Sequence, residues 1–194
     1  IFERVWVESP GFINFALTNA WLTSQVDLIR VDEQIYGNSS IGDGKKVQVE
    51  FVSVNPTGPI HVGHARGAVF GSALANVLEA AGYRVCREYY VNDSGNQIEK
   101  FSKSILARYL QLFGKDVAFP EDGYKGNYML DIAEELKQQE SDIFLNINED
   151  DAASALGELA MKKVLDQIKL DMEDLRVTYD EWFHESSLYA SGQY

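Results

Sequence analysis

The chain has 194 residues, 45% of them hydrophobic, which suits one core with appendages better than two independent domains. Its net charge of −13 excludes a surface that binds nucleic acid throughout, since such affinity comes from lysine and arginine, so any such contact must be local. The single cysteine excludes an internal disulfide, and there is no signal peptide and no apolar run of membrane-spanning length. We therefore expect a cytoplasmic protein.

The first third of the chain predicts a strand and a helix, a linker, and a second strand. Residues 1–30 predict a short strand followed by a helix with apolar faces. Residues 36–46 are polar and rich in glycine, which is typical of a linker and marks the best domain boundary. Residues 47–54 are β-branched or aromatic with partial alternation, so they predict a buried strand that ends at Asn55-Pro56.

A helix and another strand are expected next. Apolar residues recur every three to four positions from Val69 to Ala81, which predicts one apolar stripe of a helix that stops at Gly82. Residues 83–91 predict a strand. A strand, helix, strand order gives parallel strands with a right-handed crossover, and ligands bind beyond the carboxyl ends of such strands.

The rest of the chain is predicted to be mostly helical. Helical spacing of apolar residues continues over 96–113, and two further helices are expected at 128–140 and about 149–175. The chain begins at Ile1 without a methionine and stops at Tyr194 just after a predicted strand. We therefore expect a fragment of a longer protein.

The loop between the second strand and its helix, residues 55–64, fits a nucleotide-phosphate site. Gly63 lacks a side chain, so a ligand can approach the backbone there. The first amides and the positive dipole end of the helix favour an anion such as a triphosphate. His61 and His64 lie on one face of the first turn and can donate hydrogen bonds to phosphate oxygens that gain charge in a transition state.

Two other interpretations of the histidine pair stay open. Zinc ligation would need a third protein ligand, and the chain offers only the distant His184 and Cys86, so no metal site is predicted. Alternatively, both histidines could cap and pack the helix, because an isolated four-residue match does not separate a site from a structural role.

Four collinear blocks carry a resemblance to one family. Residues 49–68 read VEFVSVNPTGPIHVGHARGA and closely resemble the nucleotide-binding signature of arginyl-tRNA synthetases, which are class I aminoacyl-tRNA synthetases. Residues 87–98, REYYVNDSGNQI, match a second stretch of that family. Residues 10–15 look like the end of its N-terminal extra domain, and residues 179–188 resemble the strand by which it returns from an insertion to the nucleotide-binding core.

The resemblance implies a fold and a domain organisation. We expect an α/β fold, namely the first half of a Rossmann-type parallel sheet of a class I catalytic domain with a mostly helical insertion, preceded by the end of an α+β N-terminal domain. The expected ranges are 1–42 for the end of the tRNA-contacting appended domain and the linker, 43–97 for the first half of the catalytic domain, 98–175 for the insertion, and 176–194 for the truncated return to the catalytic domain. Most apolar residues of the insertion should belong to the core.

The resemblance also implies an activity. Arginine would be activated by ATP, with Mg²⁺ accompanying the ATP, and the arginyl group of the adenylate would pass to arginine tRNA. ATP binding is implied for four residues of the loop: Pro59, His61, Gly63 and His64. Among these, His61 and His64 would be the catalytic pair that stabilises charge on the phosphates.

Contacts with the other two substrates are implied as well. A carboxylate within an apolar strand must lie on an exposed face or have a ligand, and the resemblance makes Glu50 the partner of arginine's α-ammonium. Asn55 would hydrogen-bond arginine's carboxylate, with His61 beside it. Asn14 and Phe15 belong to the segment that approaches the outer corner of the tRNA, although an aromatic there is more often packing. Weaker candidates for the same crevice follow the next strand: Tyr90, Asn92, Asp93 and Gln97.

Parts of the family pattern would lie beyond Tyr194: a lysine-containing triphosphate loop, an acidic residue for the guanidinium, and a helical anticodon-binding domain. The fragment is therefore expected to be inactive alone. A monomer is expected as well. A small nucleotidyltransferase, whose phosphate motif also pairs two histidines around a glycine, is an alternative. So is a non-catalytic module that binds a nucleotide or a partner protein.

Overall fold

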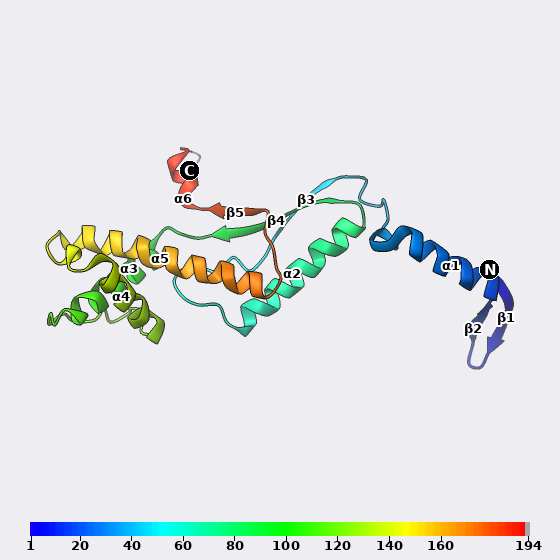
Figure 1. Cartoon of the computed structure of the whole chain (residues 1–194), viewed down its shortest axis with the longest axis horizontal. Helices are drawn as coiled ribbons and strands as arrows, with labels where there is room; N and C mark the ends of the chain where they lie inside the picture. The colour runs from blue at the N-terminus through cyan, green and yellow to red at the C-terminus, as the bar shows by residue number, and fades with distance from the viewer. Residues whose placement is uncertain (193–194) are drawn as a thin grey trace. The chain divides into compact units, whose positions relative to one another are not determined.

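A computed structural model describes residues 1–192 of the chain (Figure 1). Its contacts divide it into two compact units. The hairpin unit comprises residues 1–45 and 78–84, and the sheet unit comprises residues 46–77 and those from 85 onward. The domain boundaries expected at residues 42, 97 and 175 remain predictions, because this division does not test them.

The hairpin unit begins with two strands where the sequence suggested one. β1 (Phe2–Glu8) and β2 (Phe12–Leu17) pair in antiparallel fashion. Ser9-Pro10-Gly11 reverses the chain between them: the Gly11 N–H donates to the Glu8 carbonyl at 2.8 Å, and the φ of Gly11 is +135°, which suits glycine. This tight turn is what the single-strand prediction missed.

The helix expected in this unit is present. α1 (Asn19–Asp32) follows Thr18, whose hydroxyl accepts from the Trp21 N–H at 3.2 Å, and it leads into the short turn η1 (Glu33–Ile35). None of its residues is buried. The polar linker that follows has no regular structure, yet its amides donate to carbonyls at the end of the next helix, as in the 2.8 Å bond from Ser39 to Ala80.

The sheet unit contains three strands in the order β3 (Lys46–Glu50), β4 (Arg84–Val91) and β5 (Glu181–His184). β4 and β5 run parallel, with Glu88 opposite Glu181. Between β3 and β4 the chain forms α2 (Val62–Ala80), so the predicted strand, helix, strand order is confirmed.

The first strand of this sheet is shorter than predicted. It ends at Glu50 rather than at residue 54, because Val52 and Ser53 have φ angles of +68° and +46°. Strand residues have negative φ, so the chain leaves the sheet here despite its β-branched sequence.

Helix α2 buries its small residues and exposes its large ones. Ala68, Gly71 and Ala75 are its buried positions, whereas Val69 and Phe70 of the predicted stripe are 57% and 71% exposed. A Cβ on Gly71 would lie 2.2 Å from Cγ of Phe51, so the ring can approach the helix only where there is no side chain.

The helical insertion follows the predictions closely. It consists of α3 (Asn96–Leu112), α4 (Asn127–Glu140), the turn η2 (Ile143–Leu145) and α5 (Glu149–Asp174). Asn148 caps α5 by accepting from the Asp150 N–H at 2.8 Å, and three acidic residues occupy the first turn, as its dipole favours. The large side chains that pack fully buried between these helices are Phe101, Ile105, Tyr109, Met129, Leu136, Leu156, Ile168 and Met172. The expectation that most apolar residues of this segment are core is confirmed.

Aromatic rings join the sheet to the segments beside it. Tyr89 of β4 stacks on Trp182 of β5 with centroids 4.4 Å apart, and Tyr179 stacks on Phe51 at 4.7 Å. The short helix α6 (Ser186–Ala190) follows β5. The cluster places two tyrosine hydroxyls next to the irregular segment after β3.

Candidate functional site

The segment after β3 is held by tyrosine hydroxyls instead of strand pairing. Three phenols donate to main-chain carbonyls spaced three residues apart: Tyr179 to Phe51 (3.2 Å), Tyr89 to Val54 (3.0 Å) and Tyr128 to Thr57 (2.8 Å). Burial raises the pKa of Tyr89 and of Tyr128 to about 12, so both phenols keep their protons and donate at neutral pH. Residues 55–61, which we term the signature loop, therefore follow a defined path into α2.

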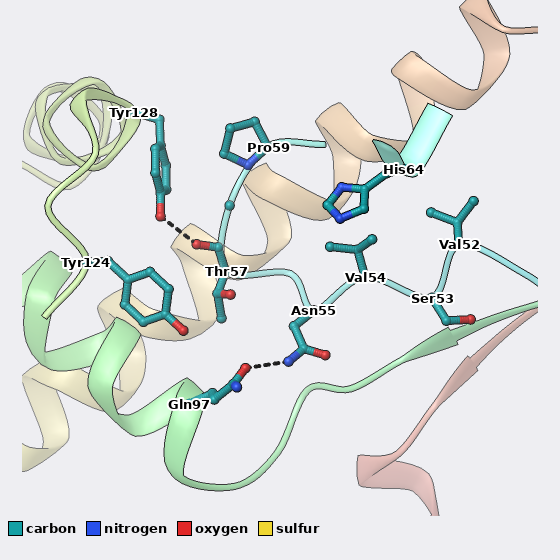
Figure 2. Close-up of a pocket in the computed structure, with 11 residues that line it drawn as sticks. Val52, Ser53, Val54, Asn55, Thr57, Pro59, His64, Gln97, Tyr124 and Tyr128 are labelled. Carbon is teal, nitrogen blue, oxygen red and sulfur yellow. Dashed lines mark hydrogen bonds between the residues drawn. The ribbon is translucent and has the colours of Figure 1, made fainter. Parts of the chain in front are cut away.

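A cavity of about 600 Å³ lies along this segment. Figure 2 draws its lining, which comprises Val52, Ser53, Val54, Asn55, Thr57, Gly58, Pro59, His64, Gln97, Tyr124 and Tyr128. The Asn55 amide donates to the Gln97 side-chain oxygen, which brings the loop against the start of α3. Among the described residues that line the cavity, none is an aspartate, glutamate, lysine or arginine, although the chain has a net charge of −13. The cavity thus lacks the carboxylates that would repel an anion.

The two histidines form a stacked pair with a defined proton arrangement. Their ring centroids are 3.6 Å apart, with planes inclined by 21°. His64 Nδ1 accepts from the His61 N–H at 3.2 Å, and His61 Nδ1 accepts from the Gly63 N–H at 3.1 Å. A neutral imidazole that accepts at Nδ1 carries its proton at Nε2. Each ring therefore offers an Nε2–H donor away from the main chain.

The neutral form of His64 is favoured here. Burial lowers the pKa of His64 below its ordinary value of 6.5, and the neighbouring His61 lowers it further. Two stacked imidazoles would repel each other if both were charged. At neutral pH the His64 ring is thus a neutral hydrogen-bond donor.

The first turn of α2 uses most of its own amides. The His64 and Ala65 N–H groups donate to the His61 carbonyl at 2.8 and 3.1 Å, and the Gly63 N–H is taken by the His61 ring. A Cβ on Gly63 would come 3.0 Å from Cε1 of His61, so the missing side chain makes room for that ring. An anion at this turn would therefore meet imidazole N–H groups and the helix dipole rather than a row of free amides.

The predicted site residues are only partly brought together. The cavity lining includes Asn55, Pro59 and His64, together with the weaker candidate Gln97. The other two predicted residues, His61 and Gly63, lie in the adjoining turn and are not part of the lining. Glu50, the last residue of β3, is exposed, and its side chain has no hydrogen bond or ion pair within residues 1–192. Glu50 thus lies on an exposed face, and its contact with arginine stays a prediction.

The two candidates for tRNA contact are neighbours on β2. Asn14 stands opposite Trp6, and Phe15 stands opposite Val5. Successive strand residues point to opposite faces, so Asn14 and Phe15 do not share one face of the hairpin. Phe15 is 52% exposed, and its ring lies 5.0 Å from that of Phe2, which agrees with partial packing.

Asp93 has a structural role that turn chemistry did not indicate. It accepts from the Ser186 N–H at 2.8 Å, the Ser186 hydroxyl at 2.9 Å and His184 Nδ1 at 2.7 Å. Partial burial raises the pKa of Asp93, but the hydrogen bonds from Ser186 and His184 outweigh it and hold that pKa below its ordinary value. Asp93 thereby ties the end of β4 to the end of β5, and neither it nor Tyr90 nor Asn92 lines the cavity.

Residues 1–192 contain neither a cluster of side chains suited to a metal ion nor a helix suited to spanning a membrane. No group of three or more histidine, cysteine, aspartate or glutamate side chains is arranged to hold a metal ion. No helix in that range has both the length and the apolar character needed to cross a membrane.

Comparison with known proteins decides the family. Residues 25–190 match the family model described as tRNA synthetases class I (R), catalytic domain. The chain belongs to the class I arginyl-tRNA synthetases. The mixed α/β fold with its parallel strands and helical insertion is consistent with the catalytic domain of this class.

Individual relatives agree with this assignment. An arginine–tRNA ligase of Dehalococcoides mccartyi is 50% identical over 192 residues, which are 99% of this chain and 34% of the relative. One from Shouchella clausii is 46% identical over 191 residues, 98% of this chain and 34% of the relative. The chain therefore spans about a third of the length of the curated relatives it matches.

Solved synthetase structures share the fold. An arginyl-tRNA synthetase structure from Campylobacter jejuni superposes with a TM-score of 0.78 at 34% identity, covering 90% of this chain and 38% of that one. The Thermus thermophilus arginyl-tRNA synthetase gives a TM-score of 0.56 at 25% identity, covering 98% of this chain and 31% of that one.

The insertion supplies two cavity residues that were not predicted as site residues. Tyr124 and Tyr128 lie in the insertion, and Tyr128 bonds to a loop residue 71 positions earlier. No local pattern connects segments so far apart. The only signal is a pair of tyrosines four residues apart around the start of a predicted helix.

Proposed function

We propose that this chain is the ATP- and arginine-binding part of a cytoplasmic, monomeric arginine–tRNA ligase, which activates arginine and transfers it to arginine tRNA. The observation that carries the proposal is the stacked His61/His64 pair, whose Nε2–H donors stand at the start of α2 beside a carboxylate-free cavity. The identity to arginine–tRNA ligases supports the choice of substrates.

In this reaction arginine's carboxylate attacks the α-phosphate of ATP, giving arginyl adenylate and pyrophosphate. The arginyl group then passes to a hydroxyl of the terminal ribose of the tRNA, and AMP leaves. Neutral Nε2–H groups can stabilise the charge that develops on phosphate oxygens, and one preorganised donor of this kind contributes about 3–4 kcal/mol. The histidines therefore act by positioning and electrostatics and form no covalent intermediate.

The remaining residues have complementary roles. Pro59 and His64 would contact ATP as part of the cavity wall. Gly63 has no side chain, which leaves room for the adjacent His61 ring. Asn55 keeps one amide N–H for arginine's carboxylate, because only the other is used by Gln97.

The amino group and the tRNA need separate contacts. Glu50 is exposed at the carboxyl end of β3, where its charge is available to arginine's α-ammonium. Asn14 and Phe15 would contact the outer corner of the tRNA from β2.

The residues present fit a nucleoside triphosphate. The cavity is lined by neutral hydrogen-bonding groups, and the adjoining helix end has a positive dipole. Mg²⁺ would accompany ATP through the phosphate oxygens, because magnesium is usually held by substrate phosphates and water rather than by an all-protein cage.

Arginine-dependent pyrophosphate exchange by the full-length protein that carries this chain tests the proposal. His61→Ala and His64→Ala should each lower the rate of adenylate formation by roughly 10²–10³ while leaving ATP affinity and the melting temperature little changed. His184→Ala is the matched control, because this third histidine contacts Asp93 and does not line the cavity. Exchange that does not require arginine would indicate a nucleotidyltransferase, and nucleotide binding without exchange would indicate a non-catalytic module.

A further inference from the structure

We propose that Tyr128 of the helical insertion is a positioning residue, which holds the signature loop in its substrate-binding shape through the Thr57 carbonyl. This inference rests on the proposed function, because it assigns Tyr128 to the same site. It adds a role for the insertion, which would otherwise only border the cavity.

The contact is direct and leaves little free space. Tyr128 Oη donates to the Thr57 carbonyl at 2.8 Å, and Figure 2 shows the phenol pointing at that oxygen across the cavity wall. Thr57 is 7% exposed, and its N–H donates to the Asn55 carbonyl at 2.7 Å, which makes a tight turn. A Cβ on Gly58 would come 3.2 Å from the same hydroxyl. The loop therefore meets Tyr128 at the turn that precedes Pro59.

The phenol is carried by a rigid element. Tyr128 is in the first turn of α4, where the next residue, Met129, is fully buried and its N–H donates to the Gly126 carbonyl at 3.1 Å. The ring also lies over Gly126, since a Cβ there would be 2.4 Å from Cε1 of Tyr128. A hydroxyl placed by a packed helix fixes its acceptor more firmly than one on a mobile loop.

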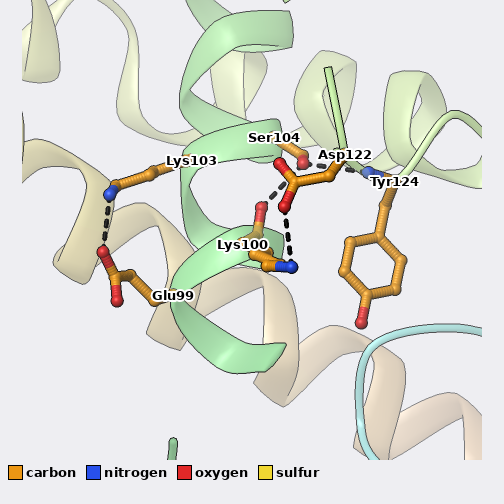
Figure 3. Close-up of polar contacts among 6 residues, drawn as sticks. All are labelled: Glu99, Lys100, Lys103, Ser104, Asp122 and Tyr124. Carbon is orange, nitrogen blue, oxygen red and sulfur yellow. Dashed lines mark hydrogen bonds and ion pairs between the residues drawn. The ribbon is translucent and has the colours of Figure 1, made fainter. Parts of the chain in front are cut away.

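Tyr124 lines the same cavity but makes no such contact, which makes it a matched control. Its N–H donates to the Ser104 hydroxyl at 3.0 Å, and that hydroxyl donates to the Lys100 carbonyl at 2.7 Å. Figure 3 shows these bonds beside the 2.7 Å ion pair between Lys100 and Asp122. Within the described part of the chain, the Tyr124 hydroxyl has no hydrogen-bond partner.

The two tyrosines thus differ in the contact that the hydroxyl makes with the loop. Both belong to well-held segments beside the cavity, and only the hydroxyl of Tyr128 is bonded to the loop. Removing each hydroxyl in turn separates a lost loop contact from a general change in the cavity wall.

The test compares Tyr128→Phe with Tyr124→Phe in the full-length protein that carries this chain. In Tyr128→Phe, hydrogen exchange of the Thr57, Gly58, Ile60 and His61 amides should be about tenfold faster, with exchange in α3 and α5 unchanged. The kcat of arginine-dependent pyrophosphate exchange should fall by about three- to tenfold, the loss expected for one neutral hydrogen bond. Tyr124→Phe should leave hydrogen exchange at residues 57–61 at the unmodified value.

A second variant tests the same contact from the loop side. Gly58→Ala crowds the same hydroxyl without removing it and should accelerate exchange in the same residues. The proposal is overturned if Tyr128→Phe and Tyr124→Phe show equal exchange at residues 57–61, or if faster exchange there leaves kcat unchanged. If the unmodified protein shows no arginine-dependent activity, the proposed function fails, and hydrogen exchange alone decides whether Tyr128 holds the loop.

Discussion

The hydroxyl of Tyr89 both donates to the Val54 carbonyl at 3.0 Å and accepts from the Val54 N–H at 3.1 Å. One side chain thereby supplies the pair of hydrogen bonds that a neighbouring strand would have supplied had β3 continued past Glu50. Tyr89 itself is fully buried, so its hydroxyl cannot be replaced by bulk water without local opening.

Tyr89→Phe should therefore destabilise the protein although it keeps the ring. The change leaves the Val54 N–H and C=O without their partner, which costs about 1–3 kcal/mol in the free energy of unfolding. Denaturant titration measures the loss. Tyr36→Phe is the control, because Tyr36 is 45% exposed and should change stability by less than about 0.5 kcal/mol. Equal effects of the two variants would contradict this account of the Val54 contact.

The same phenols predict a loss of stability at alkaline pH. Folding raises the pKa of Tyr89 and of Tyr128 from the ordinary value of 10 to about 12, and burial is the main cause. Because the folded protein holds these protons more tightly than the unfolded chain, the contribution to stability is complete below about pH 10 and is lost as the pH rises to about 12. The free energy of unfolding, measured across this range, should fall less steeply in Tyr89→Phe and Tyr128→Phe. An unchanged slope in both variants would refute the assignment.

The close approach of Phe51 to α2 gives a third prediction. Gly71→Ala would place a Cβ 2.2 Å from the Phe51 ring, so it should lower the free energy of unfolding by about 1–3 kcal/mol. Gly67→Ala, in the same helix, meets nothing within 4 Å and should be neutral or stabilising by up to about 1 kcal/mol, since alanine favours helix. Thermal melting of the two variants decides the matter, and a stable Gly71→Ala would mean that the ring can move aside.

Local sequence signals predicted the helices and the histidine pair well. The segment 128–140 was expected to be helical, and α4 runs from Asn127 to Glu140, because apolar periodicity and a turn before it are sufficient signals. His61 and His64 stack as neighbours because a spacing of three residues places them together in any helical turn.

Features that depend on contacts between distant segments could not be predicted. Val52 and Val54 alternate as in a strand, yet the left-handed φ of Val52 is tolerated only where tertiary bonds such as that of Tyr89 hold the chain. The exposed face of α2 was also not predictable, since periodicity identifies an apolar stripe and does not tell which neighbour covers it. The Tyr128 contact joins segments 71 residues apart, so no local pattern connects the two partners.

Glu50→Gln separates two tasks that this carboxylate could perform. Glu50 is exposed at the end of β3 and has no partner within the described residues, so its charge is available to a ligand. If it binds the α-ammonium, which all amino acids share, the variant in the full-length protein should raise the KM for arginine by the equivalent of about 1.5–3 kcal/mol. The preference for arginine over lysine should stay nearly intact, because the planar guanidinium would be read by a different carboxylate.

The control for that variant is Glu181→Gln, another exposed carboxylate of the same sheet, located at the start of β5 rather than at the end of β3. It should leave the KM for arginine unchanged, since ligands bind beyond the carboxyl ends of parallel strands. Steady-state pyrophosphate exchange with arginine and with lysine measures both quantities. A collapse of the preference for arginine in Glu50→Gln, with ATP binding normal, would show that Glu50 contacts the guanidinium and would refute its assignment to the α-ammonium.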